Sequence, residues 1–260
     1  MSRYLLFGNP VSHSLSSQLY ALFAKQFDMT IDYQTQCVPL DQFKNAADDF
    51  RAQGGIGANI TIPFKTSAFE YADELTDRAK LTGAVNLFIF KSGKCIGDNT
   101  DGIGLMNDLK NHSIDLHHKN ILVLGAGGAA RGILGEIIRE KPRKIAIYNR
   151  TVENAEHLIE FFKPHFQMTI LSDEKNVDII INATSSDFEN YFNLNLSNAF
   201  CYDLNYGERH RAFSNWVKRN SASLIVDGLG MLAEQAAENF FQWFGKRPER
   251  GNVIQRLRVP

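Results

Sequence analysis

A glycine-rich turn in the middle of the chain constrains the fold more than any other feature. The apolar run Asn120–Leu124 leads directly into Gly125-x-Gly127-x-x-Ala130, and a helical pattern follows to about Arg139. A strand, a tight glycine turn and a helix start are the context in which this motif holds the pyrophosphate of a dinucleotide. The helix N-terminus offers free N–H groups and the positive end of its dipole to the phosphates. We therefore predict a dinucleotide site formed by Gly125, Ala126, Gly127, Gly128 and Ala129.

The end of the next predicted strand, Lys144–Tyr148, indicates which dinucleotide is bound. In NAD sites an acidic residue, roughly 20 residues past the glycines, accepts hydrogen bonds from the ribose hydroxyls. Here the strand is followed by Asn149-Arg150-Thr151, which contains no carboxylate. A guanidinium can pair with the 2′-phosphate of NADP, and the amide and the hydroxyl can donate to it. The sequence therefore predicts NADP as the cofactor.

Strands alternate with helices through both halves of the chain. In the first half the patterns predict strands at 4–8, 32–38, 57–62, 85–91 and 94–97, and helices at 16–27 and 40–53. In the second half they predict strands at 120–124, 144–148, 177–182, 200–204 and 223–226, and helices from the glycine turn to about 139, at 151–162 and at 229–244. This order predicts an α/β fold with a parallel sheet in the second half. We expect two domains, one at 1–101 joined by C-terminal helices from about 229–260, and a Rossmann-type domain at 102–228.

The composition excludes several classes of function. The 28 Lys and Arg residues balance 29 Asp and Glu residues, so we expect neither a nucleic-acid nor a membrane partner. Neither a signal peptide nor an apolar stretch long enough to span a bilayer is visible, so we expect a cytoplasmic protein. The three cysteines are far apart and the histidines lack ligand spacing, so we expect no disulfide and no metal.

Small polar residues gather where the predicted strands of the first half end. Such residues suit a small ligand with hydroxyl or carboxylate groups, because each buried polar group of the ligand needs a partner. In an extended segment, residues 59 and 61 would project to the same side. The residues are Ser12, Ser14, Ser16, Asn59, Thr61, Lys65, Asn86 and the polar turn Asp98–Gly102.

Six motifs in order along the chain resemble those of the shikimate dehydrogenase family. They are Phe7-Gly8-Asn9-Pro10 with His13-Ser14-x-Ser16, Gly57-Ala58-Asn59-Ile60-Thr61-Ile62-Pro63-Phe64-Lys65, Gly83-Ala84-Val85-Asn86, Gly97-Asp98-Asn99-Thr100-Asp101-Gly102, Ile181-Asn182-Ala183-Thr184-Ser185, and Asp227-Gly228-Leu229-Gly230-Met231-Leu232-x-x-Gln235-Ala236. The resemblance implies reduction of 3-dehydroshikimate to shikimate by NADPH, on the pathway to chorismate and the aromatic amino acids. A monomer or a homodimer is expected.

The resemblance also implies roles for individual residues. Lys65 and Asp101 resemble the catalytic pair, in which the lysine delivers a proton to the reacting oxygen and the aspartate orients the ammonium and a substrate hydroxyl. Ser14 and Ser16 resemble the residues that bind the substrate carboxylate. The implied ligands of the substrate hydroxyls are Asn59, Thr61, Asn86 and Gln235, with Tyr206 also reaching the substrate; the implied nicotinamide contacts are Asp77, Leu204, Gly228 and Met231.

The chain departs from the family pattern at several positions, among them Gly207 after Tyr206, where many members have a longer side chain. Ser17 stands where the family often has proline, Ala130 where it often has serine or threonine, and Asn154 where some members have an arginine beside the 2′-phosphate. The departure at Asn154 bears on the affinity for NADP rather than on the choice of NADP, whereas Ser17 loosens the substrate loop but keeps Ser16. Two alternatives stay open: a quinate/shikimate dehydrogenase that uses both substrates, and a non-catalytic NADP-binding regulatory module.

Overall fold

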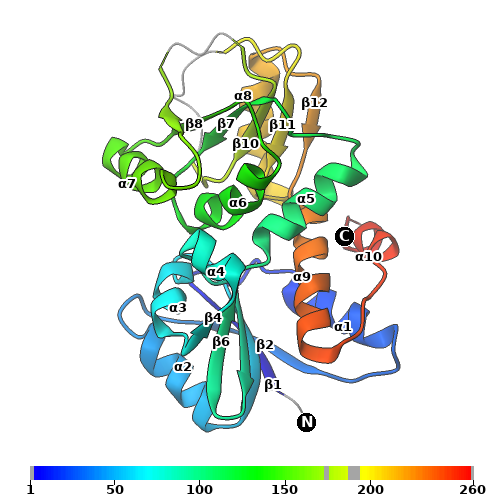
Figure 1. Cartoon of the computed structure of the whole chain (residues 1–260). Coiled ribbons are helices and arrows are strands. Elements are labelled where there is room, and N and C mark those ends of the chain that lie inside the picture. Colours follow the sequence, from blue (N-terminus) through cyan, green and yellow to red (C-terminus); the bar gives the residue numbers. More distant parts are fainter. Residues whose placement is uncertain (1–2, 173–175, 187–193, 259–260) are drawn as a thin grey trace. The chain divides into compact units, whose positions relative to one another are not determined.

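The computed structural model describes residues 3–172, 176–186 and 194–258. The chain divides into two compact units, which we call unit 1 (Met1–Leu105 and Leu232–Pro260) and unit 2 (Met106–Met231). The division falls inside two helices, α5 (Asp101–Asn111) and α9 (Leu229–Phe244). In the described part of the chain each unit has its own six-stranded sheet (Figure 1). This arrangement confirms the predicted α/β fold with C-terminal helices that pack on the first part of the chain.

The sheet of unit 1 is mixed, with strand order β2-β1-β3-β5-β6-β4. Strand β1 runs parallel to β2 and β3, whereas β5 is antiparallel to both β3 and β6. The elements of unit 1 other than α5 and α9 are β1 (Arg3–Gly8), α1 (Ser16–Lys25), β2 (Asp32–Cys37), α2 (Phe43–Ala52), β3 (Gly55–Ile60), α3 (Lys65–Tyr71), β4 (Glu74–Leu75), α4 (Asp77–Thr82), β5 (Leu87–Lys91), β6 (Lys94–Asp98) and α10 (Gly251–Arg258).

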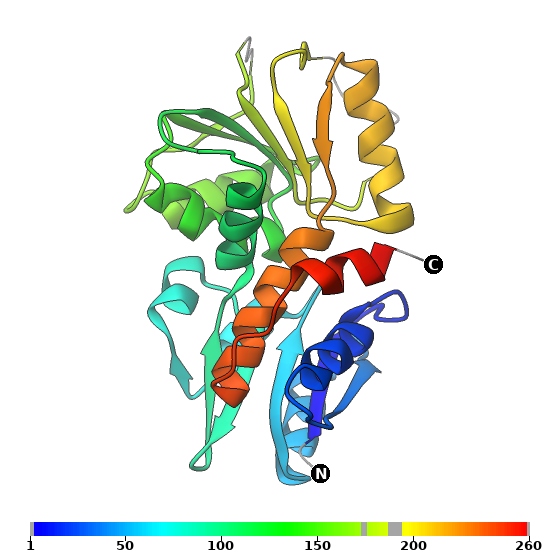
Figure 2. The same ribbon diagram turned by 90° about the vertical axis from the view of Figure 1, so that its right-hand side faces the viewer.

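Helices cover both faces of this sheet. Successive side chains of a strand point to opposite faces, and the buried side chains of β1 therefore pack on helices on either side. Phe7 of β1 packs edge-on against Phe43 and Phe50 of α2. Tyr4 of the same strand packs on Trp243 of α9, with 4.7 Å between ring centroids. Figure 1 shows α2 and α3 on one face, and in Figure 2 the orange α9 and red α10 lie beside the blue α1.

The sheet of unit 2 is entirely parallel, with strand order β12-β11-β10-β7-β8-β9. The chain begins this sheet at its centre with β7 and then adds strands on either side, so β7 is flanked by β8 and β10. In such a sheet, ligands bind beyond the carboxyl ends of the strands where the winding direction changes. The elements of unit 2 are β7 (Asn120–Leu124), α6 (Gly128–Arg139), β8 (Lys144–Tyr148), α7 (Val152–Phe162), β9 (Thr169–Ile170), β10 (Ile179–Asn182), β11 (Phe200–Asp203), a short 3₁₀ turn (Gly207–Arg209), α8 (His210–Arg219) and β12 (Leu224–Val226).

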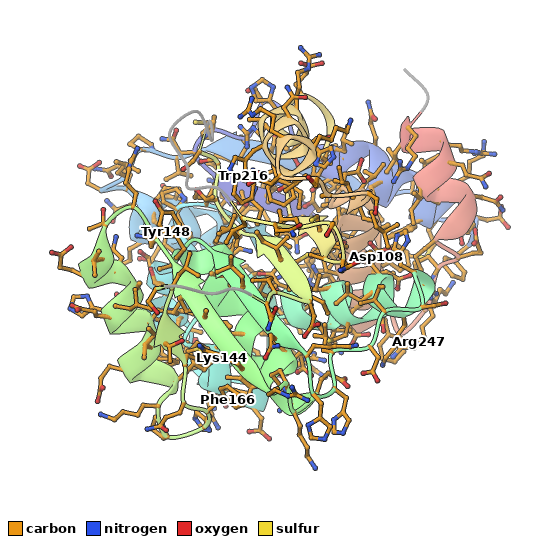
Figure 3. The ribbon with its side chains drawn as sticks, turned by 90° about the horizontal axis from the view of Figure 1, so that it is seen from above. Asp108, Lys144, Tyr148, Phe166, Trp216 and Arg247 are labelled. Carbon is orange, nitrogen blue, oxygen red and sulfur yellow. The ribbon has the colours of Figure 1, made fainter. Side chains whose placement is uncertain are left out.

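The central strands of the second sheet, β7, β10 and β11, are buried on both faces along almost their whole length. Leu122 and Leu124 of β7 share one cluster with Phe213 and Trp216 of α8. Figure 3 labels Trp216, together with Lys144 and Tyr148, which are the first and last residues of β8. The polar triplet that we predict to select NADP follows directly after Tyr148.

Several local predictions need correction. The structure begins helices at Lys65, Asp77 and Asp101, where the sequence patterns predicted no helix; α3 and α4 have only 7 and 6 residues, which is too short for a clear helical period. Helix α8 was not predicted either, and α10 lies in the expected C-terminal helical region 229–260, for which no separate bounds were predicted. Strand β3 ends at Ile60, so Thr61 does not continue the strand beside Asn59.

Candidate active site and dinucleotide site

A lysine and an aspartate form an ion pair in the interior of unit 1. Lys65 is the first residue of α3 and Asp101 the first residue of α5. The Lys65 Nζ lies 2.5 Å from Asp101 Oδ2, and the two side chains are only 12% and 7% exposed. The structure therefore brings together the two residues that we predict to be catalytic, which are 36 positions apart in the chain.

Asn86 holds the other oxygen of that aspartate. Its Nδ2 donates to Asp101 Oδ1 at 2.8 Å and to Thr100 Oγ1 at 3.0 Å, while its Oδ1 accepts from the Thr100 backbone N–H at 2.9 Å. Asn99 Oδ1 accepts from the Asp101 backbone N–H at 3.1 Å. Asp101 is therefore fixed at both its backbone and its side chain, with Oδ2 directed to Lys65.

Helix α9 adds two amides to the same cluster. Asn239 Oδ1 accepts from Thr100 Oγ1 at 2.7 Å, and Asn239 Nδ2 donates to Gln235 Oε1 at 2.9 Å. Gln235 Oε1 also lies 3.4 Å from Asn86 Nδ2, at the long limit for a hydrogen bond. Gln235 of α9 thus lies beside Asn86, which is 149 positions earlier in the chain.

The predicted carboxylate ligands contact each other in unit 1, and Tyr33 lies between Ser16 and Asn59. The Ser14 hydroxyl donates to Ser16 Oγ at 3.0 Å and accepts from the Ser16 backbone N–H at 3.2 Å. The Tyr33 hydroxyl donates to Asn59 Oδ1 at 2.8 Å, and Asn59 Nδ2 donates to the Asn86 carbonyl at 3.3 Å. Asn59 therefore connects this group to the cluster around Asp101.

Thr61 and Asp77 take less part in these contacts. Thr61 is bound through its backbone, since its N–H donates to the Phe7 carbonyl at 2.9 Å. Its methyl group lies over Gly8, where an added Cβ would approach Thr61 Cγ2 to 2.4 Å. Asp77 lies outside the cluster, at the start of α4; its side chain is 95% exposed and its nearest charge is Lys80, at 3.9 Å.

Sequence reasoning gave no individual role to four members of the cluster, namely Tyr33, Asn99, Thr100 and Asn239. Asn99 and Thr100 stood in the polar turn 98–102 without roles of their own. Asn239 follows Gln235 by four positions, so both lie on one face of α9, and that spacing could have revealed it. Tyr33 carried no signal, because an aromatic residue in a strand is ordinarily part of the core. Burial raises the pKa of Tyr33 well above its usual value, so its hydroxyl is a neutral donor.

The glycine turn of unit 2 has the geometry of a phosphate cradle. Gly125 has φ +105°, and an added Cβ would lie 3.0 Å from the Ala183 carbonyl oxygen. An added Cβ on Gly127 would meet no atom within 4 Å, so the space over this residue is open. Gly127 is the N-cap of α6 and no side chain caps the helix. The first-turn N–H groups are thus available to an anion.

Asn149 connects this turn to the end of β8. Its Oδ1 accepts from the Ala126 backbone N–H at 3.2 Å, and its Nδ2 donates to the Thr151 carbonyl at 2.7 Å. Thr151 is the N-cap of α7 but makes no side-chain capping bond, which leaves its hydroxyl for another partner. Arg150 is exposed and forms no ion pair within the described ranges. An open cradle beside an unpaired guanidinium fits a dinucleotide that carries an extra phosphate.

The remaining predicted cofactor residues of unit 2 lie on the loops that follow β11 and β12 and, for Met231, in the first turn of α9. Asp203 ends β11 fully buried and accepts from Asn182, from Asn205 and from His210 Nδ1 at 2.9 Å. Leu204 follows it and packs against Gly228, where an added Cβ would lie 2.2 Å from the Leu204 carbonyl oxygen. Met231 is buried near the start of α9, and Tyr206 lies on the loop after β11.

The described ranges contain neither a metal-binding cluster nor a helix that could span a membrane. No group of three or more His, Cys, Asp or Glu side chains there is placed to hold a metal ion. None of the helices formed by those residues has the length and apolar character needed to cross a bilayer.

Three family models match the chain in succession. The models described as the shikimate dehydrogenase substrate binding domain, as shikimate / quinate 5-dehydrogenase and as the shikimate 5'-dehydrogenase C-terminal domain match residues 6–88, 108–193 and 228–258. Together they cover most of both units.

Relatives of known name are similar over almost the whole chain. Proteins named Shikimate dehydrogenase (NADP(+)) from Vibrio cholerae serotype O1 and from Vesicomyosocius okutanii are 41% and 45% identical; each alignment covers 99% of this chain, and 96% and 100% of the relative. A solved structure described as a shikimate dehydrogenase in complex with NADP+ is 32% identical, with a TM-score of 0.87, and the match covers 100% of this chain and 96% of that one.

Proposed function

Because the chain belongs to the shikimate dehydrogenase family, we propose that it catalyses the reversible, NADPH-dependent reduction of 3-dehydroshikimate to shikimate, a step on the way to chorismate and the aromatic amino acids. One observation carries the proposal furthest: a buried ion pair between Lys65 and Asp101, surrounded by uncharged hydrogen-bonding side chains. A proton donor must be held in a fixed position relative to the atom that it protonates. The carboxylate of Asp101, 2.5 Å from Lys65 Nζ, holds the ammonium in this way, so the lysine is suited to protonate a ketone oxygen.

The residues of unit 1 supply binding and the proton. Lys65 Nζ donates to the carbonyl oxygen of 3-dehydroshikimate and gives it a proton as the hydroxyl forms; in the reverse direction it takes that proton back. Asp101 keeps Nζ in place through Oδ2, and Asn86 keeps Asp101 in place through Oδ1. NADPH, when bound, supplies the hydride.

The remaining polar side chains of the cluster orient the substrate. Ser14 and Ser16 present two hydroxyls in contact with each other, which suits a carboxylate that accepts from both. The hydroxyls of the ring would be bound by Asn59, Thr61, Asn86 and Gln235, and Tyr206 would also reach the substrate. A ligand with many hydroxyls is favoured here because nearly every group in the cluster is a neutral donor or acceptor.

Unit 2 would hold NADP. The turn Gly125–Ala129 would bind the pyrophosphate through N–H groups of α6, and Asn149, Arg150 and Thr151 would bind the 2′-phosphate. The nicotinamide end would contact Leu204, Gly228 and Met231, together with Asp77. With Asn154 in place of an arginine, Arg150 would be the principal cation for the 2′-phosphate.

We also propose domain limits and a setting for the enzyme. The substrate-binding domain would comprise 1–101 with 229–260, and the NADP-binding domain 102–228. The protein would work in the cytoplasm as a monomer or a homodimer, without nucleic-acid or membrane partners.

Two other functions can be separated from this one by assay. A dual-specificity enzyme would oxidise quinate as well as shikimate, and the description of the second family model names both compounds. A regulatory module would bind NADP without turnover, although the retained Lys65–Asp101 pair argues against that reading. The test is NADPH formation by purified protein with shikimate or quinate, each with NADP or NAD. High turnover with shikimate and NADP, and low turnover with the other three combinations, supports the proposal.

A further inference from the structure

Tyr20 of α1 carries a buried hydroxyl without a hydrogen-bond partner. The residue is 1% exposed. Among buried side-chain nitrogen and oxygen atoms of the described residues, only its hydroxyl oxygen lacks a hydrogen bond. Burial raises the pKa of Tyr20 above its usual value, so the group is a neutral O–H donor. A buried donor left unpaired costs free energy, and such groups in folded proteins call for an explanation.

The Tyr20 ring belongs to the apolar cluster of α1 and α9, and its hydroxyl lies where that cluster meets the polar side chains of the substrate cluster. The Tyr20 ring stacks on the ring of Tyr33 with 4.4 Å between centroids and 20° between planes, and Tyr33 donates to Asn59. The side chains of Asn59 and Asn239 are near enough to oppose the effect of burial on the pKa of Tyr20. Neither forms a hydrogen bond of normal geometry with it.

Both neighbouring amides are already engaged with other groups of the cluster. Asn59 accepts from Tyr33 and donates to the Asn86 carbonyl at 3.3 Å. Asn239 accepts from Thr100 and donates to Gln235. Asn59 and Gln235 are the residues for which we propose contacts with the substrate hydroxyls. A ligand that binds Asn59 and Gln235 changes the hydrogen-bond partners of Asn59 directly. It changes those of Asn239 through Gln235, to which Asn239 donates.

We propose that Tyr20 is a positioning residue for the substrate: its hydroxyl gains a hydrogen bond to Asn59 or Asn239 when the substrate hydroxyls engage Asn59 and Gln235. The inference rests on the proposed function, since it takes shikimate as the ligand. The unpaired hydroxyl then penalises the free protein and not the complex, so it shifts the equilibrium toward the complex. It acts through the two amides, because the hydroxyl itself is closed to solvent.

The test compares Tyr20→Phe with two other tyrosine variants. Tyr4→Phe is the matched control, because Tyr4 is a buried tyrosine of the same unit that packs on Trp243, as Tyr20 does, but among the described residues forms no hydrogen bond with the substrate cluster. Tyr33→Phe removes a hydroxyl that is bonded in the free protein. The measurements are the unfolding midpoint with and without saturating shikimate, and kcat and KM for shikimate at saturating NADP.

We expect opposite effects on stability and binding in Tyr20→Phe. The free variant should melt about 2 °C or more above the unaltered protein. Its KM for shikimate should rise about five- to tenfold, with kcat changed less than about twofold, and shikimate should raise its midpoint less. Tyr33→Phe should lose both stability and binding, and Tyr4→Phe should retain the KM.

The outcomes separate this inference from the proposed function. An unchanged KM in Tyr20→Phe, or a lower midpoint of the free variant, overturns the inference, because the hydroxyl would then serve no ligand or would already be bonded. If the unaltered protein reduces no NADP with shikimate, the proposed function fails, and this inference fails with it. Active unaltered protein with an unaffected Tyr20→Phe variant refutes only the role of Tyr20.

Discussion

The amide nitrogen of Asn86 lies 2.8 Å from Oδ1 of Asp101, and both side chains are buried. One oxygen of the carboxylate is therefore occupied by a neutral donor, and only the other is open to an ammonium. Asn86 thus decides which way Asp101 faces, even though it carries no charge and moves no proton. A carboxylate held in this way can orient a lysine without competing rotamers.

Replacement of Asn86 by alanine should damage both folding and turnover. It leaves the Thr100 N–H and one oxygen of Asp101 without their partners, each a buried polar group. We expect a loss of about 1–3 kcal/mol in the free energy of unfolding, measured with denaturant, and a lower kcat. Asn45→Ala, on the exposed face of α2, is the control. An Asn86→Ala enzyme with full kcat would mean that Asp101 needs no such support.

Replacement of Lys65 by alanine should remove proton transfer while sparing most of the binding. We expect kcat to fall about 10²- to 10⁴-fold, with a smaller change in the KM for shikimate. The comparison is Lys44→Ala, which removes an exposed lysine that pairs with Asp48. Steady-state kinetics decide the matter: equal losses in kcat and in affinity, or no loss, argue against a proton-transfer role for Lys65.

Replacement of Arg150 by alanine should weaken NADP binding and leave the poor use of NAD unchanged. The guanidinium is exposed, so solvent reduces the effect, and we expect the KM for NADP to rise roughly tenfold. Arg211→Ala changes an exposed arginine of α8 that pairs with Glu208, and it should alter neither constant. Similar losses for NADP and NAD in Arg150→Ala would show that the residue does not read the 2′-phosphate.

The two glycines of the turn should respond differently to an added methyl group. Gly125→Ala forces a side chain onto φ +105° and against the Ala183 carbonyl, so we expect a loss of about 1–3 kcal/mol in stability. Gly127→Ala meets open space and should fold normally while its methyl group obstructs the phosphates. Unfolding curves and NADP titrations separate the two effects. Equal stability of both variants contradicts the assigned geometry.

Only one of the three cysteines should react rapidly with a thiol reagent. Burial raises the pKa of both Cys95 and Cys201 to about 12, so at pH 8 both remain protonated as well as covered. Cys37 is exposed. We expect one fast thiol per chain in native protein, lost in Cys37→Ser, and three after unfolding. Two fast thiols in the native state would place one of the buried cysteines at the surface.

The elements that sequence patterns predicted well are those with strong local signals. The apolar strands β7, β8 and β10, the glycine turn and helices α6, α7 and α9 are all present, each within a few residues of its predicted range. Their signals are local because a buried parallel strand is apolar throughout and a long helix repeats its apolar face. Helices α3 and α4 were missed because seven and six residues span fewer than two helical turns.

The substrate cluster could not be assembled from sequence patterns alone. Its members are single polar residues at the ends of separate elements, and each one read as a turn or surface residue. The resemblance to a family joined Lys65 with Asp101, and the structure then placed Nζ beside Oδ2. Neither the sequence patterns nor the family resemblance could predict the unpaired hydroxyl of Tyr20. Such a group is recognised only when every neighbouring donor and acceptor has been located.

The most direct test of the account is the rate of NADPH formation, followed by absorbance, with purified protein, shikimate and NADP. We predict rapid NADPH formation with this pair, a much lower rate when quinate replaces shikimate or NAD replaces NADP, and almost none in Lys65→Ala. Binding of NADP without any NADPH formation from shikimate would contradict it.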